Sequence, residues 1–228
     1  HYLDTIQKYA KVLVQRNALL KNMAEHRLFD RDSIEVWNVQ MIILGKQIHE
    51  KRSAFLDEFI PVFQKHYDSI GNENEQVHLV YKSQLNDAPM EKLLVEYERK
   101  DAFTRYSNAG IHKDDLIFEI KGHQVKKFGS QGQQKSFLIA LRLAQYEWLK
   151  EHLGVLPILL LDDIFDKLDH TRVERLMKLV ANNYFGQVLV TDTDVQRVKT
   201  IFGESDLKAT IFSVEDGKVE QLIESEAI

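Results

Sequence analysis

The chain has 228 residues, of which 44% are hydrophobic, enough to bury one sizeable core or two smaller ones. It contains no cysteine, which excludes disulfides and thiolate metal sites, and it has no run of about 18 apolar residues, so no segment is expected to span a membrane. The net charge is −5, and residues 1–106 and 107–228 carry 15 and 15 Lys and Arg against 16 and 19 Asp and Glu, so neither part has the basic excess typical of a nucleic-acid-binding domain.

The chain begins inside a helical pattern. Its first residues, His1-Tyr2-Leu3-Asp4, include no initiator Met and resemble no signal peptide, because there is neither a basic region nor a long apolar stretch. We therefore expect the sequence to be a piece of a longer protein.

The start of the chain, about 60 residues, is predicted to form a helical hairpin. The first helix covers 1–27, with a seam at Leu3, Ile6, Ala10, Leu13, Leu20 and Ala24. The second helix begins near Ser33 as its cap, and Arg52 interrupts its seam, which consists of Ile34, Trp37, Met41, Leu44, Ile48, Phe55, Phe59 and Val62. Pro61 is expected to kink or end this helix. Two such helices with a short link form an antiparallel pair, which suits either a plain helical subdomain or a partner-binding arm.

The next segments alternate between strands and helices. Residues 68–76 are predicted to be a loop, 77–83 a strand and 91–106 a charged, exposed helix. Later elements are expected at 116–120 and 124–128 (strands), 131–152 (helix), 158–161 (strand), 170–183 (helix), 188–191 (strand), and 209–214 with 218–223 (a hairpin around Asp216-Gly217). The continuous apolar run at 158–161 is typical of a strand buried on both faces of a parallel sheet. This order predicts an α/β lobe at 107–228 after an all-helical domain at 1–106.

Two carboxylates follow the apolar strand at 158–161. Asp162 and Asp163 would lie at the carboxyl end of the strand, where open α/β sheets gather their ligands. A carboxylate at this place can hold Mg²⁺, and a second one can orient or deprotonate an attacking water. The alternative is a loop that is merely capped by aspartate.

Ser130-Gln131-Gly132-Gln133-Gln134 precedes the long helix at 131–152. Ser130 and Gln133 have the spacing of a capping box, which starts a helix. The same helix N-terminus offers free N–H groups to a phosphate, and Gly132 lets the backbone approach a ligand closely. A third element, Leu168-Asp169, lies where the next helix begins, and by itself it is an ordinary helix cap.

These three elements in this order resemble the signature motif, the Walker B strand and the D-loop of an ABC-type ATPase. Within that class the chain is most similar to the RecF family. Besides the signature and the Walker B run, the resemblance is carried by Gln15-Arg16-Asn17-Ala18-Leu19-Leu20-Lys21 and by Gly110-Ile111-His112-Lys113-Asp114-Asp115, although 112–115 have no physical explanation in the sequence. It is weakest in 66–106 and 196–228.

The resemblance implies a role for each matching residue. Asp162 would be the metal ligand for Mg²⁺, and Asp163 would be the catalytic residue, in the place where most ABC ATPases have a glutamate. Ser130, Gln131, Gly132 and Gln133 would contact the ATP that the other subunit binds, and Asp169 would lie at the dimer interface. Thr193 stands where many ABC ATPases have a switch histidine, which puts a histidine sensor of the γ-phosphate in doubt. No G-x-x-x-x-G-K-[ST] phosphate loop occurs in the sequence.

The resemblance also implies a function. The family is expected to be a slow ATPase that forms an ATP-dependent homodimer, binds single- and double-stranded DNA at gap junctions, and works with RecR and RecO to load RecA. This implies roles in DNA replication, repair, recombination and the SOS response, and a cytoplasmic, nucleoid-associated location. Without the phosphate loop, these residues alone are expected to be inactive. Lys8, Lys11, Arg16 and Lys21 of the first helix could line a DNA groove once two subunits meet.

Two other classes remain open at this point. One is a recombination ATPase of the chromosome-structural or double-strand-break type, but such proteins have far longer coiled-coil arms than a hairpin of about 60 residues. The other is a non-enzymatic interaction module, against which the paired carboxylates and the complete signature argue.

Overall fold

A computed structural model of the chain describes residues 1–71, 75–165, 168–181, 185–203 and 209–224. The chain forms two compact units, one from residues 1–60 and 78–118, the other from residues 61–77 and 119–228. The domains expected at 1–106 and 107–228 were assigned by resemblance to the family, and they stay a prediction. The contacts group 61–77 with the later residues and 107–118 with the earlier ones.

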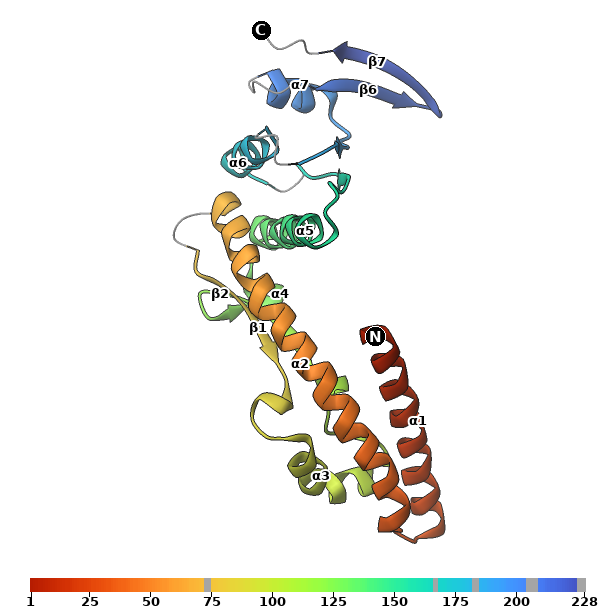
Figure 1. Ribbon diagram of the computed structural model, residues 1–228. Helices are drawn as coiled ribbons and strands as arrows, with labels where there is room; N and C mark the ends of the chain where they lie inside the picture. Colours follow the sequence, from red (N-terminus) through yellow and green to blue (C-terminus); the bar gives the residue numbers. More distant parts are fainter. Residues whose placement is uncertain (72–74, 166–167, 182–184, 204–208, 225–228) are drawn as a thin grey trace. The chain divides into compact units, whose positions relative to one another are not determined.

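Two long helices dominate the first unit. Helix α1 (Tyr2–His26) and helix α2 (Arg31–Ile70) run side by side in an antiparallel pair (Figure 1), as predicted. The cap of α2 is Asp30, not Ser33: the Ser33 backbone N–H and hydroxyl both donate to the Asp30 carboxylate. Pro61 lies inside α2 and does not end it.

The buried face of α1 differs from the predicted seam. Its buried residues are Tyr9, Val12, Arg16, Leu20 and Met23, which repeat at helical spacing. Leu3 of the predicted seam is 65% exposed. Leu20 of the predicted seam is buried, and Ile6 and Leu13 pack against the core, so the seam is only partly correct. The apolar pattern missed the middle of the buried face because a charged residue, Arg16, occupies it.

Shorter elements complete the first unit. They are β1 (Val77–Lys82), the 3-10 turn η1 (Gln84–Asn86), α3 (Met90–Thr104), the 3-10 turn η2 (Ile111–Lys113) and β2 (Asp115–Ile120). Helix α3 was expected to be exposed, but Met90, Leu93 and Leu94 are buried. Met90 and Leu94 belong to a core with Tyr9, Val12, Met41, Ile48 and Ile111. This core joins α1, α2 and α3.

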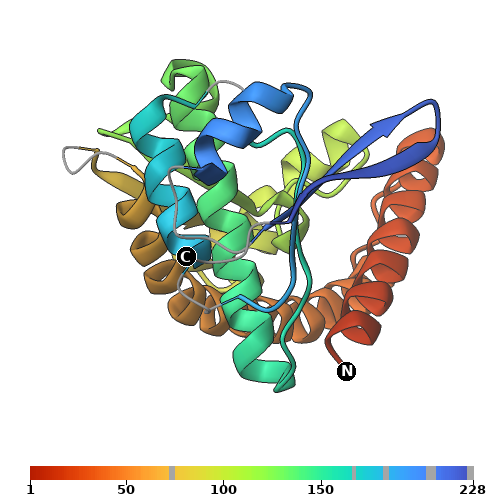
Figure 2. The same cartoon turned by 90° about the horizontal axis from the view of Figure 1, so that it is seen from above.

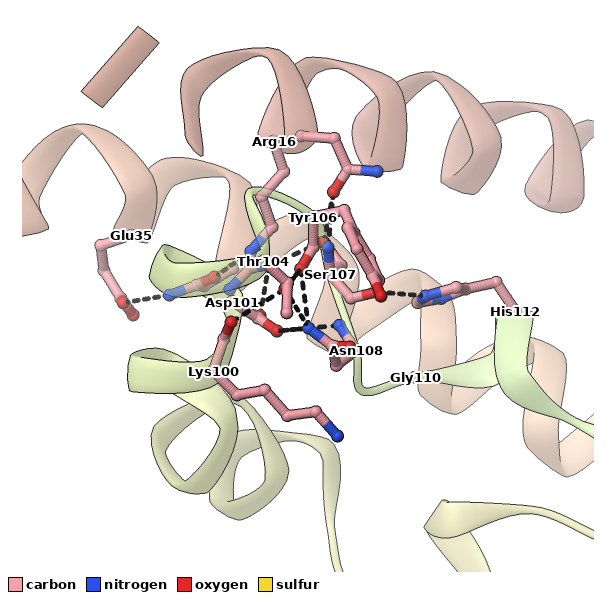
Figure 3. Close-up of polar contacts among 12 residues, drawn as sticks. Arg16, Glu35, Lys100, Asp101, Thr104, Tyr106, Ser107, Asn108, Gly110 and His112 are labelled. Atoms are coloured by element: carbon pink, nitrogen blue, oxygen red, sulfur yellow. Dashed lines mark hydrogen bonds and ion pairs between the residues drawn. The ribbon is translucent and has the colours of Figure 1, made fainter. Parts of the chain in front are cut away.

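A buried polar network connects α1 to the segment that follows α3 (Figure 3). Arg16 is 1% exposed and donates to Asp101 Oδ2 at 2.8 Å and to the Ser107 hydroxyl at 2.7 Å. Asp101 Oδ1 accepts from the backbone N–H of Asn108 at 2.8 Å and from its amide at 2.9 Å. Asn17 accepts from Ser107 through both backbone and hydroxyl. Arg16 and Asn17, two residues that carried the family resemblance, thus hold this unit together, and Arg16 is not available to DNA.

Two of the residues at 112–115 that had no explanation in the sequence, His112 and Asp114, have one in the structure, as does the neighbouring Gly110. Gly110 has φ 126°, and a Cβ there would lie 2.8 Å from the Met90 methyl carbon, so only glycine fits. His112 donates from Nε2 to the Ser107 carbonyl at 3.0 Å, and its Nδ1 accepts from the Tyr9 hydroxyl at 3.1 Å. Asp114 accepts from Arg52 at 2.6 Å, which explains the break in the α2 seam.

The His112 contacts predict a pH dependence of stability. Burial lowers the pKa of His112 below its ordinary value, because the charged ring loses its hydration. Because the folded state favours the neutral ring, His112 contributes stability above its unfolded-state pKa of about 6.5. This contribution is lost as the pH falls through the folded-state pKa of His112. We expect the free energy of unfolding to drop between pH 7 and pH 5, and to drop less in His112→Gln. Urea titrations at both pH values measure this, and an unchanged slope in His112→Gln would contradict it.

The second unit is built around one long helix. Helix α5 (Gln131–Leu153) packs beside α6 (His170–Ala181), as both views show (Figures 1 and 2). Their shared core contains Leu143, Tyr146, Leu176 and Met177. The last turns of α2 belong to this unit, where Phe63 lies 4.7 Å from Phe137 between ring centres. The predicted strand at 124–128 is wrong: β3 is only His123–Gln124, and α4 (Val125–Phe128) follows.

The strands of the second unit form small sheets. Strand β3 pairs antiparallel with the last two residues of β2, which belong to this unit, in the register Glu119↔Gln124 and Ile120↔His123. Strand β4 (Leu159–Leu161) pairs in parallel with β5 (Val188–Val190), and helix α7 (Val195–Gly203) follows. Strands β6 (Thr210–Glu215) and β7 (Lys218–Glu224) form the predicted hairpin, with Asp216 and Gly217 both at positive φ.

The prediction that β4 is buried on both faces is wrong for this chain. Leu159 and Leu161 are buried, but Leu160 is 67% and Leu189 49% exposed. Both exposed side chains belong to register partners in the parallel pair, so they lie on the same face of the sheet. The sequence shows a strand suited to two-sided burial, while the described part of the chain covers one side.

Candidate functional site

The carboxyl end of β4 places both predicted carboxylates at the surface. Asp162 and Asp163 are exposed, and the Thr191 hydroxyl, directly after β5, donates to Asp162 Oδ1. The backbone N–H of Asp163 donates to the same Thr191 oxygen at 3.1 Å. Thr191 therefore fixes the turn after β4 from the neighbouring strand. Thr191 was not among the predicted site residues, although its position directly after a second apolar strand could have indicated it.

Asp163 has an unusual backbone conformation. Its φ is 46°, in the left-handed region that aspartate tolerates better than most residues. Its carbonyl accepts from Lys135 Nζ at 2.6 Å. Within the described residues its carboxylate has no hydrogen-bond partner, so the backbone is held while the carboxylate is free to bind a ligand or a water.

The N-terminus of α5 has the predicted capping box. The Ser130 hydroxyl accepts from the Gln133 backbone at 3.2 Å, and the Gln133 side chain accepts from the Ser130 backbone at 2.9 Å. Gln131 is exposed and Gly132 half-buried. Lys135, in the first turns of α5, reaches the Asp163 carbonyl, so the helix that follows the predicted signature is connected to the turn after β4.

The predicted D-loop residue Asp169 caps helix α6. Its Oδ1 accepts from the backbone N–H of Arg172 at 2.9 Å, and its Oδ2 lies 3.3 Å from Arg172 Nη1. The Asp169 side chain is 54% exposed, which leaves it accessible to another molecule. The plain helix-cap geometry is confirmed, and a role at an interface stays a prediction.

A buried ion pair that sequence reasoning missed lies behind these motifs. Arg172 donates from Nη2 to Glu75 Oε1 at 2.8 Å, and both side chains are 7% exposed. Glu75 Oε1 also accepts from Gln133 Nε2 at 3.0 Å. No local pattern announces this pair, because its members are 97 positions apart.

Thr193 lies in the bend between β5 and α7 and is exposed. The neighbouring Asp192 instead accepts from Arg197 of α7 at 2.9 Å, and its side chain is fully buried. The structure thus places Thr193 near the carboxyl end of β5. Whether it takes the place of a switch histidine stays a prediction.

The oxygen atoms at the carboxyl ends of β4 and β5 suit a hard cation that also binds a phosphate ligand. Asp162 supplies a carboxylate oxygen and Thr191 a hydroxyl, and Mg²⁺ typically takes one or two carboxylates together with phosphate oxygens and waters. Across the described ranges, no group of three or more His, Cys, Asp or Glu residues could by itself enclose a metal. Over the same ranges, every helix is too short or too polar to cross a bilayer.

Comparisons with known proteins agree with this arrangement. No protein-family model matches the chain. It is 50% identical over 213 residues to the DNA replication and repair protein RecF of Flavobacterium johnsoniae, covering 93% of this chain and 59% of that protein. With RecF of Phocaeicola vulgatus the identity is 45% over 219 residues, covering 96% and 58%. A solved structure of the recombination mediator protein RecF with ATP superimposes with a TM-score of 0.72 at 24% identity, covering 97% and 58%.

The fold is that of part of an ABC-type ATPase domain, and the chain also has a helical unit. The chain belongs to the RecF family, which confirms the resemblance and removes the chromosome-structural alternative. It spans about three fifths of the length of the curated relatives that it matches.

Proposed function

We propose that the chain is part of an ATP-dependent DNA-binding dimer that acts in recombinational DNA repair and in replication restart. The observation that supports this most strongly is the link from Lys135, in the helix of the signature, to the Asp163 carbonyl after β4. The relatives are named as DNA replication and repair proteins, and the solved neighbours as RecF with ATP in the RecFOR pathway. This supports ATP as the ligand and RecO and RecR as partners.

The residue roles follow from the chemistry of each side chain. Asp162, which Thr191 orients, would hold Mg²⁺, and Mg²⁺ would neutralise charge on the phosphates of ATP. Asp163 would orient the attacking water, because its backbone is fixed on two sides while its carboxylate is unengaged within the described residues.

The signature would act on ATP that a second subunit binds. The N–H groups of Gln131 and Gly132 at the start of α5 would face the γ-phosphate. Ser130 and Gln133, whose N–H groups close the capping box, would complete the set of contact residues. Asp169 would lie at the interface beside them. ATP then stabilises the closed dimer by contacts that exist only in that state, and hydrolysis removes them. The closed dimer would hold DNA at single-strand gaps, where RecA is loaded.

One of the four α1 residues first expected to line a DNA groove is not accessible. Lys8, Lys11 and Lys21 are exposed, but Arg16 is buried against Asp101. DNA binding would depend on cations that two subunits bring together, because the charge of this chain is negative and phosphate contacts need clustered Lys and Arg.

We expect the complete protein to dimerise in ATP and Mg²⁺ and not in ADP, and to bind gapped DNA only under the first condition. Sedimentation and fluorescence anisotropy at two salt concentrations measure both. The control is a polypeptide of these 228 residues, which should not bind ATP, because the sequence has no phosphate loop to cradle the phosphates. Equal dimerisation with ATP and ADP, or micromolar ATP binding by the control, would contradict the proposal.

A further inference from the structure

The buried pair of Glu75 and Arg172 links two motifs that are distant in sequence. Arg172 contacts Asp169 through its backbone N–H and its guanidinium. The same guanidinium binds both carboxylate oxygens of Glu75, at 2.8 and 3.1 Å. Glu75 in turn accepts from the Gln133 amide at 3.0 Å. A continuous polar chain therefore runs from the capping box of α5 to the cap of α6.

Both the oxygen and the nitrogen of the Gln133 side-chain amide take part in this series of hydrogen bonds. Its oxygen accepts from the Ser130 backbone, and its nitrogen donates to Glu75. A capping box accepts glutamate as readily as glutamine, so the cap alone does not explain the amide. A glutamate here would place a second carboxylate against Glu75. The contact with Glu75 therefore explains why residue 133 is an amide.

Burial makes this connection rigid. Tyr67 also donates to Glu75 Oε2, at 2.8 Å, so Tyr67, Gln133 and Arg172 all hold the carboxylate. A pair that is 7% exposed on both sides has no water to replace a lost partner. Moving the start of α5 relative to the start of α6 would break these bonds, so the two starts are held in one fixed relation.

We propose that Glu75 and Arg172 are positioning residues that hold the signature and the D-loop in the single arrangement that the ATP-bound dimer requires. This inference rests on the proposed function, in which Gln133 faces ATP and Asp169 faces the partner subunit. Glu75 and Arg172 act through these residues. Loss of the link leaves each motif folded but no longer held at one distance from the other, and dimerisation weakens while the ATP affinity of the monomer does not.

The test compares Gln133→Glu, Glu75→Gln and the double variant in the complete protein. Gln133→Glu keeps the capping box and the Glu75–Arg172 pair but sets two carboxylates against each other. We expect it to weaken ATP-driven dimerisation roughly tenfold or more. The double variant exchanges the two groups, so the cluster again has one carboxylate and one amide: the amide nitrogen at position 75 can donate to the carboxylate at position 133, while its oxygen still accepts from Arg172. Dimerisation should therefore be tighter than in Gln133→Glu. Glu75→Gln alone removes the carboxylate opposite Arg172, and we expect it to weaken dimerisation as well. Gln145→Glu adds the same charge on an exposed position of α5 and should behave as the unsubstituted protein.

The measurements are the dissociation constant of the dimer in ATP, the ATP affinity of the monomer and the melting temperature. A weakened dimer with unchanged ATP affinity, restored by the second substitution, supports the proposal. Dimerisation of Gln133→Glu at the unsubstituted level, or a double variant no better than Gln133→Glu, overturns it. If the unsubstituted protein does not dimerise with ATP, the proposed function itself fails, and that outcome is separate because it precedes any substitution.

Discussion

Replacing Asp163 with asparagine in the complete protein is expected to slow ATP hydrolysis by roughly 10²–10⁴-fold, the usual effect of losing a positioned acid–base group. ATP binding and ATP-driven dimerisation should persist, because the γ-phosphate that joins the subunits is not removed. The turn itself should survive, since its hydrogen bonds to Thr191 and Lys135 come from the Asp163 backbone. Asparagine also tolerates the left-handed conformation.

Asp162→Asn is the matched comparison. This substitution removes an anionic ligand from a hard cation, so we expect weaker Mg²⁺-dependent nucleotide binding as well as slower turnover. Single-turnover hydrolysis and the lifetime of the ATP-bound dimer, measured for both variants, distinguish the two roles. If Asp163 only capped the turn, its replacement would cost about 1 kcal/mol of stability and leave the rate unchanged. A normal hydrolysis rate in Asp163→Asn would remove the residue from the catalytic site.

The largest effect on stability is expected at Asp101. The Asp101 side chain is 1% exposed, and it pairs with the side chain of Arg16, which is 2% exposed. Asp101→Ala leaves the Arg16 guanidinium buried without its counter-ion, and we expect a loss of about 3–5 kcal/mol in the free energy of unfolding. Two hydrogen bonds from Asn108 are lost as well.

The control is an exposed ion pair in the same unit. Arg31 and Glu98 lie 2.9 Å apart, but the Arg31 side chain is 77% exposed. Glu98→Ala should cost about 0–1 kcal/mol, because water replaces the lost partner. Urea denaturation of the two variants beside the unsubstituted protein measures both losses. Similar losses in the two variants would show that burial does not determine the strength of the Arg16–Asp101 pair.

Local signals determined most of the secondary structure and the position of the candidate site. The capping box of Ser130 and Gln133 depends on residues three positions apart, and it was predicted with the correct partners. The hairpin around Asp216-Gly217 depends on two turn residues, and it too formed as expected. The carboxylates after β4 followed from an apolar run that ends in Asp162 and Asp163. In each case the physical cause lies within a few residues of its effect.

Errors in the predicted elements arose where burial depends on the rest of the protein. The apolar pattern of α1 indicated a face through Leu3, but the buried face contains Arg16, because Asp101 neutralises its charge there. The apolar run of β4 indicated burial on two sides, but Leu160 is exposed in this chain. Periodicity records which side chains are apolar, and burial also depends on what lies opposite them.

The tertiary structure alone decided which distant side chains meet. Arg16 and Asp101 are 85 positions apart, Gln133 and Glu75 are 58 apart, and Arg172 and Glu75 are 97 apart. Each is a charged or polar residue that sequence patterns place on the surface, because an unpaired charge is costly to bury. Only the path of the chain brings a partner within hydrogen-bonding distance. The sequence by itself therefore determined the family, the main helices and the carboxylates of the candidate site, while folding decided the contacts that connect the start of α5 with the start of α6.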